Sequence, residues 1–239
     1  MADKALEGRT VLVTGSSKGI GAATAKALAA QGAHVILTGR DVRALEAVED
    51  AIHEAGGAST IAPVDLTETD GIARLASAIA GRWDTLDGLV IAAAYLPTLT
   101  PVTQIDAKQF GQAITTNILA TQALLAAFDP LLKRADAAKV IGLTSSVGET
   151  PRAYWSAYAS TKAAFDNLLE SYAQEVEKVS KVRVAILDPG ATRTSMRAKA
   201  YPGEDPKTVK EPDVVADRIV ELMVNGFDSA HRERVSEAG

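Results

Sequence analysis

The chain has 239 residues, enough for one large domain or two small ones, and its 47% hydrophobic and 23% charged content is ordinary for a globular protein with a buried core. The net charge of -5 argues against non-specific binding of nucleic acid, which requires a basic surface. There is no cysteine, and His34, His53 and His231 form no spaced cluster, so we expect neither disulfides nor a metal site.

The first ten residues are polar and lack the apolar core of a signal peptide, and no apolar run reaches the roughly 18 residues of a membrane span. A cytoplasmic location without membrane contact is therefore expected.

Short apolar runs then alternate with amphipathic segments. The runs predict strands over 9–14, 33–39, 59–65, 87–94, 138–146 and 182–190, with a weak last strand over 232–237. The segments predict helices over 22–32, 42–57, 70–83, 107–135 (interrupted near Pro130), 156–179 and 212–227.

This alternation of apolar strands and helices is typical of an α/β fold, a parallel sheet covered on both faces. No linker or repeat divides the chain, so residues 1–239 are expected to form a single domain. One segment, 195–212, is polar, rich in proline and without periodicity. An unpatterned segment of that length inside a compact domain is usually functional or mobile.

The first strand leads into a glycine-rich turn, "VTGSSKGIG" (13–21). A strand, three glycines and a following helix are what a dinucleotide pyrophosphate requires, although the spacing is GxxxGxG and not GxGxxG. The same turn also contains G-x-S-x-G, the nucleophile elbow of a serine hydrolase, with Ser17 as nucleophile and Asp188 and His231 as conceivable partners. The elbow leaves Gly21 without a role. A tight turn with no ligand is the third alternative, and a Walker loop is excluded because no Gly-Lys-Ser/Thr follows.

A second motif, Tyr158-x-x-x-Lys162, lies in a predicted helix. Residues i and i+4 share one helix face, and a cation one turn away from a phenol favours the phenolate and lowers its pKa. Such a pair suits general acid/base chemistry near neutral pH, but it also occurs by chance on solvated helix faces.

The combination is more specific than either motif. The chain carries, in this order, Thr14-Gly15-x-x-x-Gly19-Ile20-Gly21, Asp65, Asn117, Ser145, Tyr158-x-x-x-Lys162 and Pro189-Gly190-x-x-x-Thr194. Their order and spacing over about residues 8–225 resemble the compact, single-domain branch of the short-chain dehydrogenase/reductase family. The resemblance implies a doubly wound parallel sheet (Rossmann-type) of about seven strands with helices on both faces. It also implies an NAD(H) or NADP(H) cofactor, and a homodimer or homotetramer joined through the long helices.

The resemblance further implies the roles of single residues. Tyr158 would be the catalytic acid/base, and Lys162 would lower its pKa and bind the nicotinamide ribose. Ser145 would bind the substrate oxygen, and Asn117 would hold a water of the proton relay. The implied cofactor-binding residues are Gly15, Ser17, Lys18, Gly19, Ile20, Gly21, Arg40, Asp65, Ala92, Tyr158, Lys162, Pro189, Gly190, Thr192 and Thr194. Asn117, Asp65 and Ser145 could instead be a polar contact inside a helix, a turn cap and a strand-end hydroxyl.

Two departures from the family pattern affect this interpretation. The Asn-Asn-Ala-Gly expected after the fourth strand is here Ile91-Ala92-Ala93-Ala94, so the side chain that ties neighbouring strands is missing. The last strand also lacks its usual glycine-rich end.

The second strand decides between the two cofactors. It ends in Thr38-Gly39-Arg40, with no acidic residue at its tip to bind the ribose hydroxyls of NAD. Arg40 and Lys18 instead match a 2′-phosphate, with Ser17 as a further donor, and favour NADP(H). The alternative is that Arg40 and Lys18 are solvated surface charges with no ligand. The neighbouring Asp41 would partly neutralise Arg40.

We therefore expect an NADP(H)-dependent oxidoreductase that interconverts a small-molecule carbonyl and its alcohol, with 195–212 as a mobile substrate lid. The expected substrate walls are Tyr95, Leu96, Val147, Arg152, Tyr154, Trp155 and that lid. The alternatives are a non-catalytic, NADP(H)-binding or scaffolding member of the same fold and, more remotely, a serine hydrolase using Ser17. The sequence names no substrate.

Overall fold

The computed structural model describes residues 4–236 and contains one seven-stranded sheet in which every neighbouring pair is parallel. The strand order is β3-β2-β1-β4-β5-β6-β7. The strands are β1 (Thr10–Thr14), β2 (His34–Thr38), β3 (Ala58–Ile61), β4 (Gly88–Ile91), β5 (Lys139–Leu143), β6 (Arg183–Asp188) and β7 (His231–Arg234). The doubly wound, Rossmann-type sheet expected from the sequence is confirmed.

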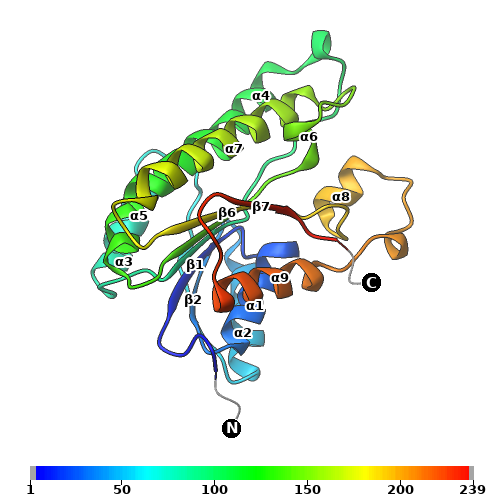
Figure 1. Ribbon diagram of the computed structural model, residues 1–239. Coiled ribbons are helices and arrows are strands. Elements are labelled where there is room, and N and C mark those ends of the chain that lie inside the picture. The colour runs from blue at the N-terminus through cyan, green and yellow to red at the C-terminus, as the bar shows by residue number, and fades with distance from the viewer. Residues whose placement is uncertain (1–3, 237–239) are drawn as a thin grey trace.

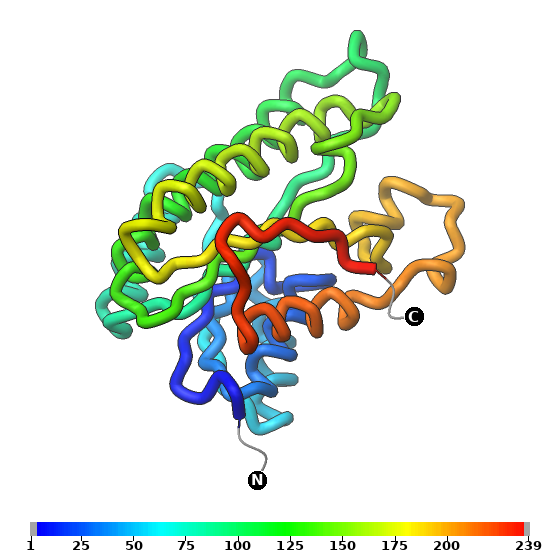
Figure 2. The backbone as a smooth tube through the Cα atoms, in the orientation of Figure 1, coloured from blue at the N-terminus to red at the C-terminus, as the bar shows by residue number. Residues whose placement is uncertain are grey.

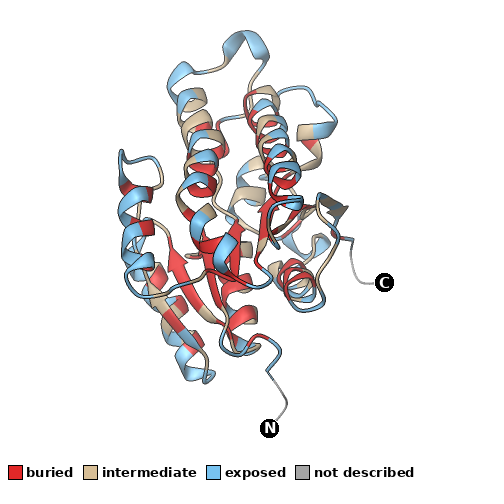
Figure 3. Cartoon of the chain, turned by 60° about the vertical axis from the view of Figure 1, so that its left-hand side comes forward, coloured by how far each residue is buried: buried red, intermediate tan, exposed pale blue. Residues whose placement is uncertain are grey.

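Helices cover both faces of the sheet (Figure 1). They are α1 (Gly19–Ala30), α2 (Val42–Glu54), α3 (Gly71–Ala80), α4 (Ala107–Ile114), α5 (Ala120–Arg134), α6 (Ser146–Glu149), α7 (Ser156–Glu177), α8 (Ser195–Ala200) and α9 (Pro212–Asn225). One core cluster joins the sheet to α1, α2 and α9, and another joins it to α3, α5 and α7. The central strands are buried on both sides, which explains why they are continuous apolar runs with no alternation (Figure 3).

The strand order places the site. The chain reverses its direction of strand addition between β1 and β4, and in open parallel sheets ligands bind at the carboxyl edge beside such a switch point. Thr14 at the end of β1 is in register with Thr38 of β2 and with Ile91 of β4. The glycine turn therefore emerges directly at this switch point.

The last strand is confirmed, in a shifted position. β7 spans His231–Arg234 where the sequence predicts 232–237, and residue 237 lies outside the described part of the chain. The tube in Figure 2 shows β7 running along β6, with which it pairs, before the described part of the chain stops at residue 236, close to the 195–212 segment. There the Lys210 ammonium donates a hydrogen bond to the Val235 carbonyl at 3.0 Å.

Three predictions made from the sequence need correction. The interruption of the long helix lies at a π-helical turn, Thr115–Leu119, and not at Pro130, which lies inside α5. Pro130 is exposed, so water can bind the carbonyl that its missing N–H leaves free. The first helix begins at Gly19, not residue 22, and the 195–212 segment contains α8 and a 3₁₀ turn (Pro206–Thr208). None of the helices described is long and apolar enough to cross a membrane.

Candidate active site

The glycine turn between β1 and α1 leaves no room for side chains. Gly15 and Gly19 have φ values of +67° and +56°, in the left-handed region that favours glycine. A Cβ atom on Gly15 would lie 2.9 Å from the Ala93 Cα atom, and one on Gly21 would lie 2.3 Å from the Gly15 carbonyl oxygen. The glycines therefore let the turn close against the end of β4 and against itself.

The turn also presents the amino end of α1 without a cap. Lys18 is the N-cap residue, and its side chain makes no capping hydrogen bond. The first backbone N–H groups of a helix have no partner inside the helix, and together with the helix dipole they favour a bound anion. The chain thus places an uncapped helix terminus beside a cleft.

Hydroxyl groups tie the strand ends together around this turn. The Thr14 hydroxyl accepts hydrogen bonds from the Ala92 and Ala93 amides at 3.1 and 3.2 Å. The Ser16 hydroxyl donates to the Thr38 carbonyl at 3.2 Å, and the Thr38 hydroxyl donates to the Ala62 carbonyl at 2.7 Å. Thr14 therefore links β1 to the Ile91–Ala94 stretch, where the family's asparagine is missing.

A single cleft collects most of the residues singled out by the sequence. Its lining includes Gly15, Ser17, Lys18, Gly19, Ile20, Gly21, Arg40, Asp65, Ala92, Tyr158, Lys162, Pro189 and Thr194. Four of the expected site residues, Asn117, Ser145, Gly190 and Thr192, are not part of that lining.

The basic end of the cleft lies at the tip of β2. The Arg40 side chain is 65% exposed, and its guanidinium is 3.9 Å from the Asp65 carboxylate. Burial by itself raises the pKa of Asp65. The hydrogen bonds from Thr67 and the charge of Arg40 lower it by more, so the pKa of Asp65 lies below its usual value. Asp41, a suspected neutraliser of Arg40, instead caps α2 by accepting a hydrogen bond from the Ala44 amide at 3.2 Å.

Tyr158 and Lys162 lie one turn apart on the buried face of α7, and both line the cleft. The pKa of Tyr158 is raised, not lowered as the sequence predicts, because burial raises it above its ordinary value and the charges of Asp188 and Asp166 raise it further. Burial lowers the pKa of Lys162 to about 8, against an upward contribution from Asp166. The Lys162 ammonium donates a hydrogen bond to the Leu143 carbonyl at 2.7 Å. The pair thus combines a protonated phenol with an amine whose pKa is close to neutral.

Asn117 is buried in the π-helical turn and clamps the chain that follows β4. Its amide oxygen accepts from the Tyr95 backbone N–H at 2.8 Å. Its amide nitrogen donates to the Tyr95 carbonyl at 3.0 Å and to the Thr161 hydroxyl at 2.9 Å. Both amide hydrogens are therefore used, and a bound water would have to use one of the oxygen atoms of Asn117. Its role in a proton relay stays a prediction.

The other residues outside the lining lie close to it. Ser145 is the residue before α6, next to Thr144, which lines the cleft with a buried hydroxyl that has no hydrogen-bond partner among the described residues. Sequence reasoning missed Thr144, and only the orphaned hydroxyl marks it. Thr192 donates to the Pro189 carbonyl at 3.0 Å, and Gly190 has a φ of +63°. These two residues shape the loop after β6.

An apolar cluster packs around Tyr158, and of its members only Tyr158 and Met196 line the cleft. Leu96 and Val147 are buried against Tyr158, and Trp155 and Met196 pack on that cluster. α8 is linked to this cluster by a hydrogen bond from the Lys199 ammonium to the Leu96 carbonyl at 2.9 Å.

Of the residues expected to form the substrate walls, Tyr95 lines the cleft, as do Ser195 and Met196 of the expected lid, but Leu96, Val147, Arg152, Tyr154 and Trp155 do not. Arg152 instead donates to the Ser146 hydroxyl at 3.3 Å, and Tyr154 is 59% exposed.

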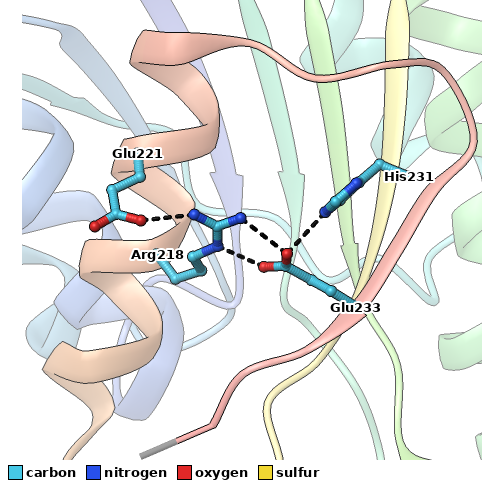
Figure 4. A network of polar contacts seen from close by, with 4 residues as sticks. All are labelled: Arg218, Glu221, His231 and Glu233. Carbon is cyan, nitrogen blue, oxygen red and sulfur yellow. Dashed lines mark hydrogen bonds and ion pairs between the residues drawn. The ribbon is translucent and has the colours of Figure 1, made fainter. Parts of the chain in front are cut away.

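The arrangement excludes the hydrolase triad. His231 contacts Glu233 at 2.8 Å, and Arg218 holds the same carboxylate with two hydrogen bonds, on the α9 side of the sheet (Figure 4). Asp188 accepts from the Gly190 amide at 2.9 Å. Ser17 therefore has neither of the partners that a nucleophile would need.

Comparison with known proteins agrees with this geometry. The short chain dehydrogenase family model matches residues 9–205, and the chain belongs to that family, a family of oxidoreductases. The chain is 35% identical over 230 residues to the uncharacterized oxidoreductase YciK of Escherichia coli K12, covering 95% of this chain and 90% of the relative.

Two similar solved structures contain a nicotinamide cofactor. A short chain dehydrogenase of Escherichia coli CFT073, crystallised with NADPH, superimposes with a TM-score of 0.94 and 33% identity, covering 99% of this chain and 100% of that one. One from Shigella flexneri 2a, crystallised with NADP, gives a TM-score of 0.92 and 33% identity, covering 97% and 98%.

Proposed function

We propose that this protein is an NADP(H)-dependent oxidoreductase that interconverts a carbonyl and an alcohol, with Tyr158 as the acid/base. One observation carries the proposal: the glycine turn and the Tyr158–Lys162 pair line the same cleft, although they are far apart in the sequence. A cofactor phosphate site and an acid/base thus open into one space. The similar proteins crystallised with NADP and NADPH support the choice of cofactor.

The residues present fit NADP(H) along the whole cleft. Gly15, Gly19 and Gly21 let the turn close tightly, and the uncapped amino end of α1 beside it would bind a pyrophosphate. Arg40, Lys18 and Ser17 would hold the 2′-phosphate, and Asp65 the adenine side. Pro189 and Thr194 would line the nicotinamide end, supported by Gly190 and Thr192 behind them. Bound NADP(H) would supply or accept the hydride.

Tyr158 moves the proton. Its raised pKa keeps the phenol protonated at neutral pH, so in the reductive direction the hydroxyl can donate a proton to the carbonyl oxygen. Lys162 uses one N–H on the Leu143 carbonyl, and its other two N–H groups are left for the ribose hydroxyls. As a cation it also stabilises the phenolate that proton donation leaves behind.

The substrate would lie between Tyr158, Ser145 and the segment 195–212. Ser145 would bind the substrate oxygen, and Asn117 would fix the Tyr95 side of the cleft and carry the relay water on an oxygen atom. The segment would act as the lid, with α8 over the apolar cluster around Tyr158. We also retain the proposals of a single domain, a cytoplasmic location and a homodimer or homotetramer, the last of which light scattering tests.

The testing experiment titrates the protein with NADPH and NADH by nicotinamide fluorescence and then screens aldehydes and ketones. Tyr158→Phe should keep NADPH affinity within a few-fold and lose about 100- to 10,000-fold in kcat, the usual contribution of a general acid. NADPH binding without any Tyr158-dependent turnover would favour the non-catalytic alternative. Failure to bind either cofactor would contradict the proposal.

A further inference from the structure

The buried charge of Lys162 needs compensation that the cleft itself does not provide. Its side chain is 3% exposed, and the ammonium contacts the Leu143 carbonyl and lies 4.2 Å from the centre of the Phe165 ring. Among residues 4–236, Lys162 forms no direct ion pair with a carboxylate. A buried ammonium without a counter-charge tends to lose its proton.

The nearest carboxylate along α7 is Asp166, one helical turn after Lys162, and it is only 6% exposed. Residues at i and i+4 lie on the same face, so the two side chains are neighbours. The Asp166 Oδ1 atom is buried and has no hydrogen-bond partner among the described residues. An unbonded carboxylate oxygen in the interior is costly, and nearby cations compensate for it.

The other oxygen of Asp166 is held from the C-terminal strand. Arg232 of β7 donates to Asp166 Oδ2 at 2.7 Å. Arg232 also contacts Glu170 at 3.2 Å and lies 3.9 Å from Glu149 of α6, so it is surrounded by acidic groups. It faces the α7 side of the sheet.

Side chains on the opposite face of β7 form their own set of ion pairs. Successive strand residues point to opposite faces, and Glu233 is bound on the α9 side by Arg218 and His231 (Figure 4). β7 is thus held from both sides, which fixes the place from which Arg232 reaches Asp166.

We infer that Asp166 is a positioning residue for Lys162, and that Arg232 holds it in place from the C-terminal strand. The carboxylate keeps the buried ammonium charged, and Arg232 limits how much negative charge reaches Tyr158. The inference rests on the role proposed above for Lys162. It links a strand at the far edge of the sheet to the acid/base pair.

Other charged groups around the pair act in known directions. Burial lowers the pKa of Lys162 to about 8, and Asp166 opposes that change. Asp188 of β6 acts mainly on Tyr158, and it is itself bonded to the Gly190 amide and 3.7 Å from Arg234. Glu149 and Glu170 both contact Arg232.

The test measures the protonation of Lys162 directly, without cofactor or substrate. The protein is produced with ¹³C-labelled lysine, the Lys162 Cε resonance is assigned with Lys162→Arg, and its titration is followed by NMR. Asp166→Asn should lower the midpoint by roughly one pH unit, more than an exposed (i, i+4) pair would give, because both groups are buried and the effective dielectric between them is lower. Arg232→Gln should raise it by a smaller amount, because a cation is removed and Asp166 is left less neutralised.

Glu170→Gln is the matched control. Glu170 also lies on α7 and contacts Arg232, but it is two turns from Lys162, so the midpoint should stay within about 0.2 units. Shifts in opposite directions for the Asp166 and Arg232 variants support the inference. An unchanged midpoint in a folded Asp166→Asn protein overturns it. If that variant does not fold, an unchanged or lowered midpoint in Arg232→Gln overturns it as well. A protein that binds no cofactor would still give this result, so the two proposals fail separately.

Discussion

The two halves of the cleft differ in whether their charged side chains are exposed or buried. On the β1–β2 side, the cations Lys18 and Arg40 are exposed, and the glycine turn is tightly packed against neighbouring backbone. On the α7 side, Lys162 and Asp166 are buried, and the compensating Arg232 comes from another strand. Exposed cations keep ordinary hydration and can select a ligand by its charge. Buried ones change pKa and can therefore take part in proton transfer.

Adding a side chain to the glycine turn should produce the largest loss of NADPH affinity among the changes on the nucleotide side of the cleft. Gly21→Ala places a Cβ atom 2.3 Å from the Gly15 carbonyl, which is backbone and cannot move aside cheaply. We expect NADPH affinity to fall by roughly 100-fold or more, about 3 kcal/mol, as measured by fluorescence titration. Gly111→Ala in α4, where a Cβ atom meets nothing within 4 Å, is the control and should be neutral. Normal NADPH binding by Gly21→Ala would contradict the importance of the backbone in this half.

Removing an exposed cation should change the preference for NADPH over NADH and leave the stability of the protein nearly unchanged. Arg40→Ala should raise the NADPH dissociation constant roughly 10- to 100-fold, because a charge-assisted contact to a phosphate is worth about 1.5–3 kcal/mol. The NADH constant should change less than about two-fold, and the melting temperature should stay constant. Arg43→Ala, an exposed arginine three residues along the chain, should affect neither cofactor. Equal losses for NADPH and NADH would refute the assignment of Arg40 to the 2′-phosphate.

The link between the strand ends should affect stability and not cofactor selectivity. Thr14→Val keeps the shape of the side chain but leaves the Ala92 and Ala93 amides without their acceptor. We expect a loss of about 1–3 kcal/mol in the free energy of unfolding, measured by urea denaturation. Thr14→Ser retains the oxygen and should recover most of that loss. If Thr14→Val were as stable as the parent protein, the strand end would not depend on this link.

Much of the site could be predicted because it depends on local sequence. A glycine turn after an apolar strand and a tyrosine one turn from a lysine are patterns within ten residues of chain, and both lie in the cleft. The apolar runs predicted the parallel sheet because strands buried on both faces cannot alternate. The family resemblance then connected the separate motifs.

The contacts that complete the site join distant residues, and no local pattern indicates them. Asn117 clamps Tyr95, 22 residues earlier, and Lys199 reaches the Leu96 carbonyl across 103 residues. Arg232 reaches Asp166 across 66 residues only because β7 pairs with β6 beside α7. The start of α1 at Gly19 likewise depends on the turn closing against β4.

The sequence by itself determined the fold class, the glycine turn and the Tyr158–Lys162 pair, since these follow from short-range periodicity and backbone sterics. Only the tertiary structure decided which charges surround Lys162 and which hydroxyl ties β1 to β4. Electrostatic compensation and hydrogen bonding act over a few ångströms in space, and the distance between two residues in space is set by the order of the strands in the sheet, not by their separation along the chain.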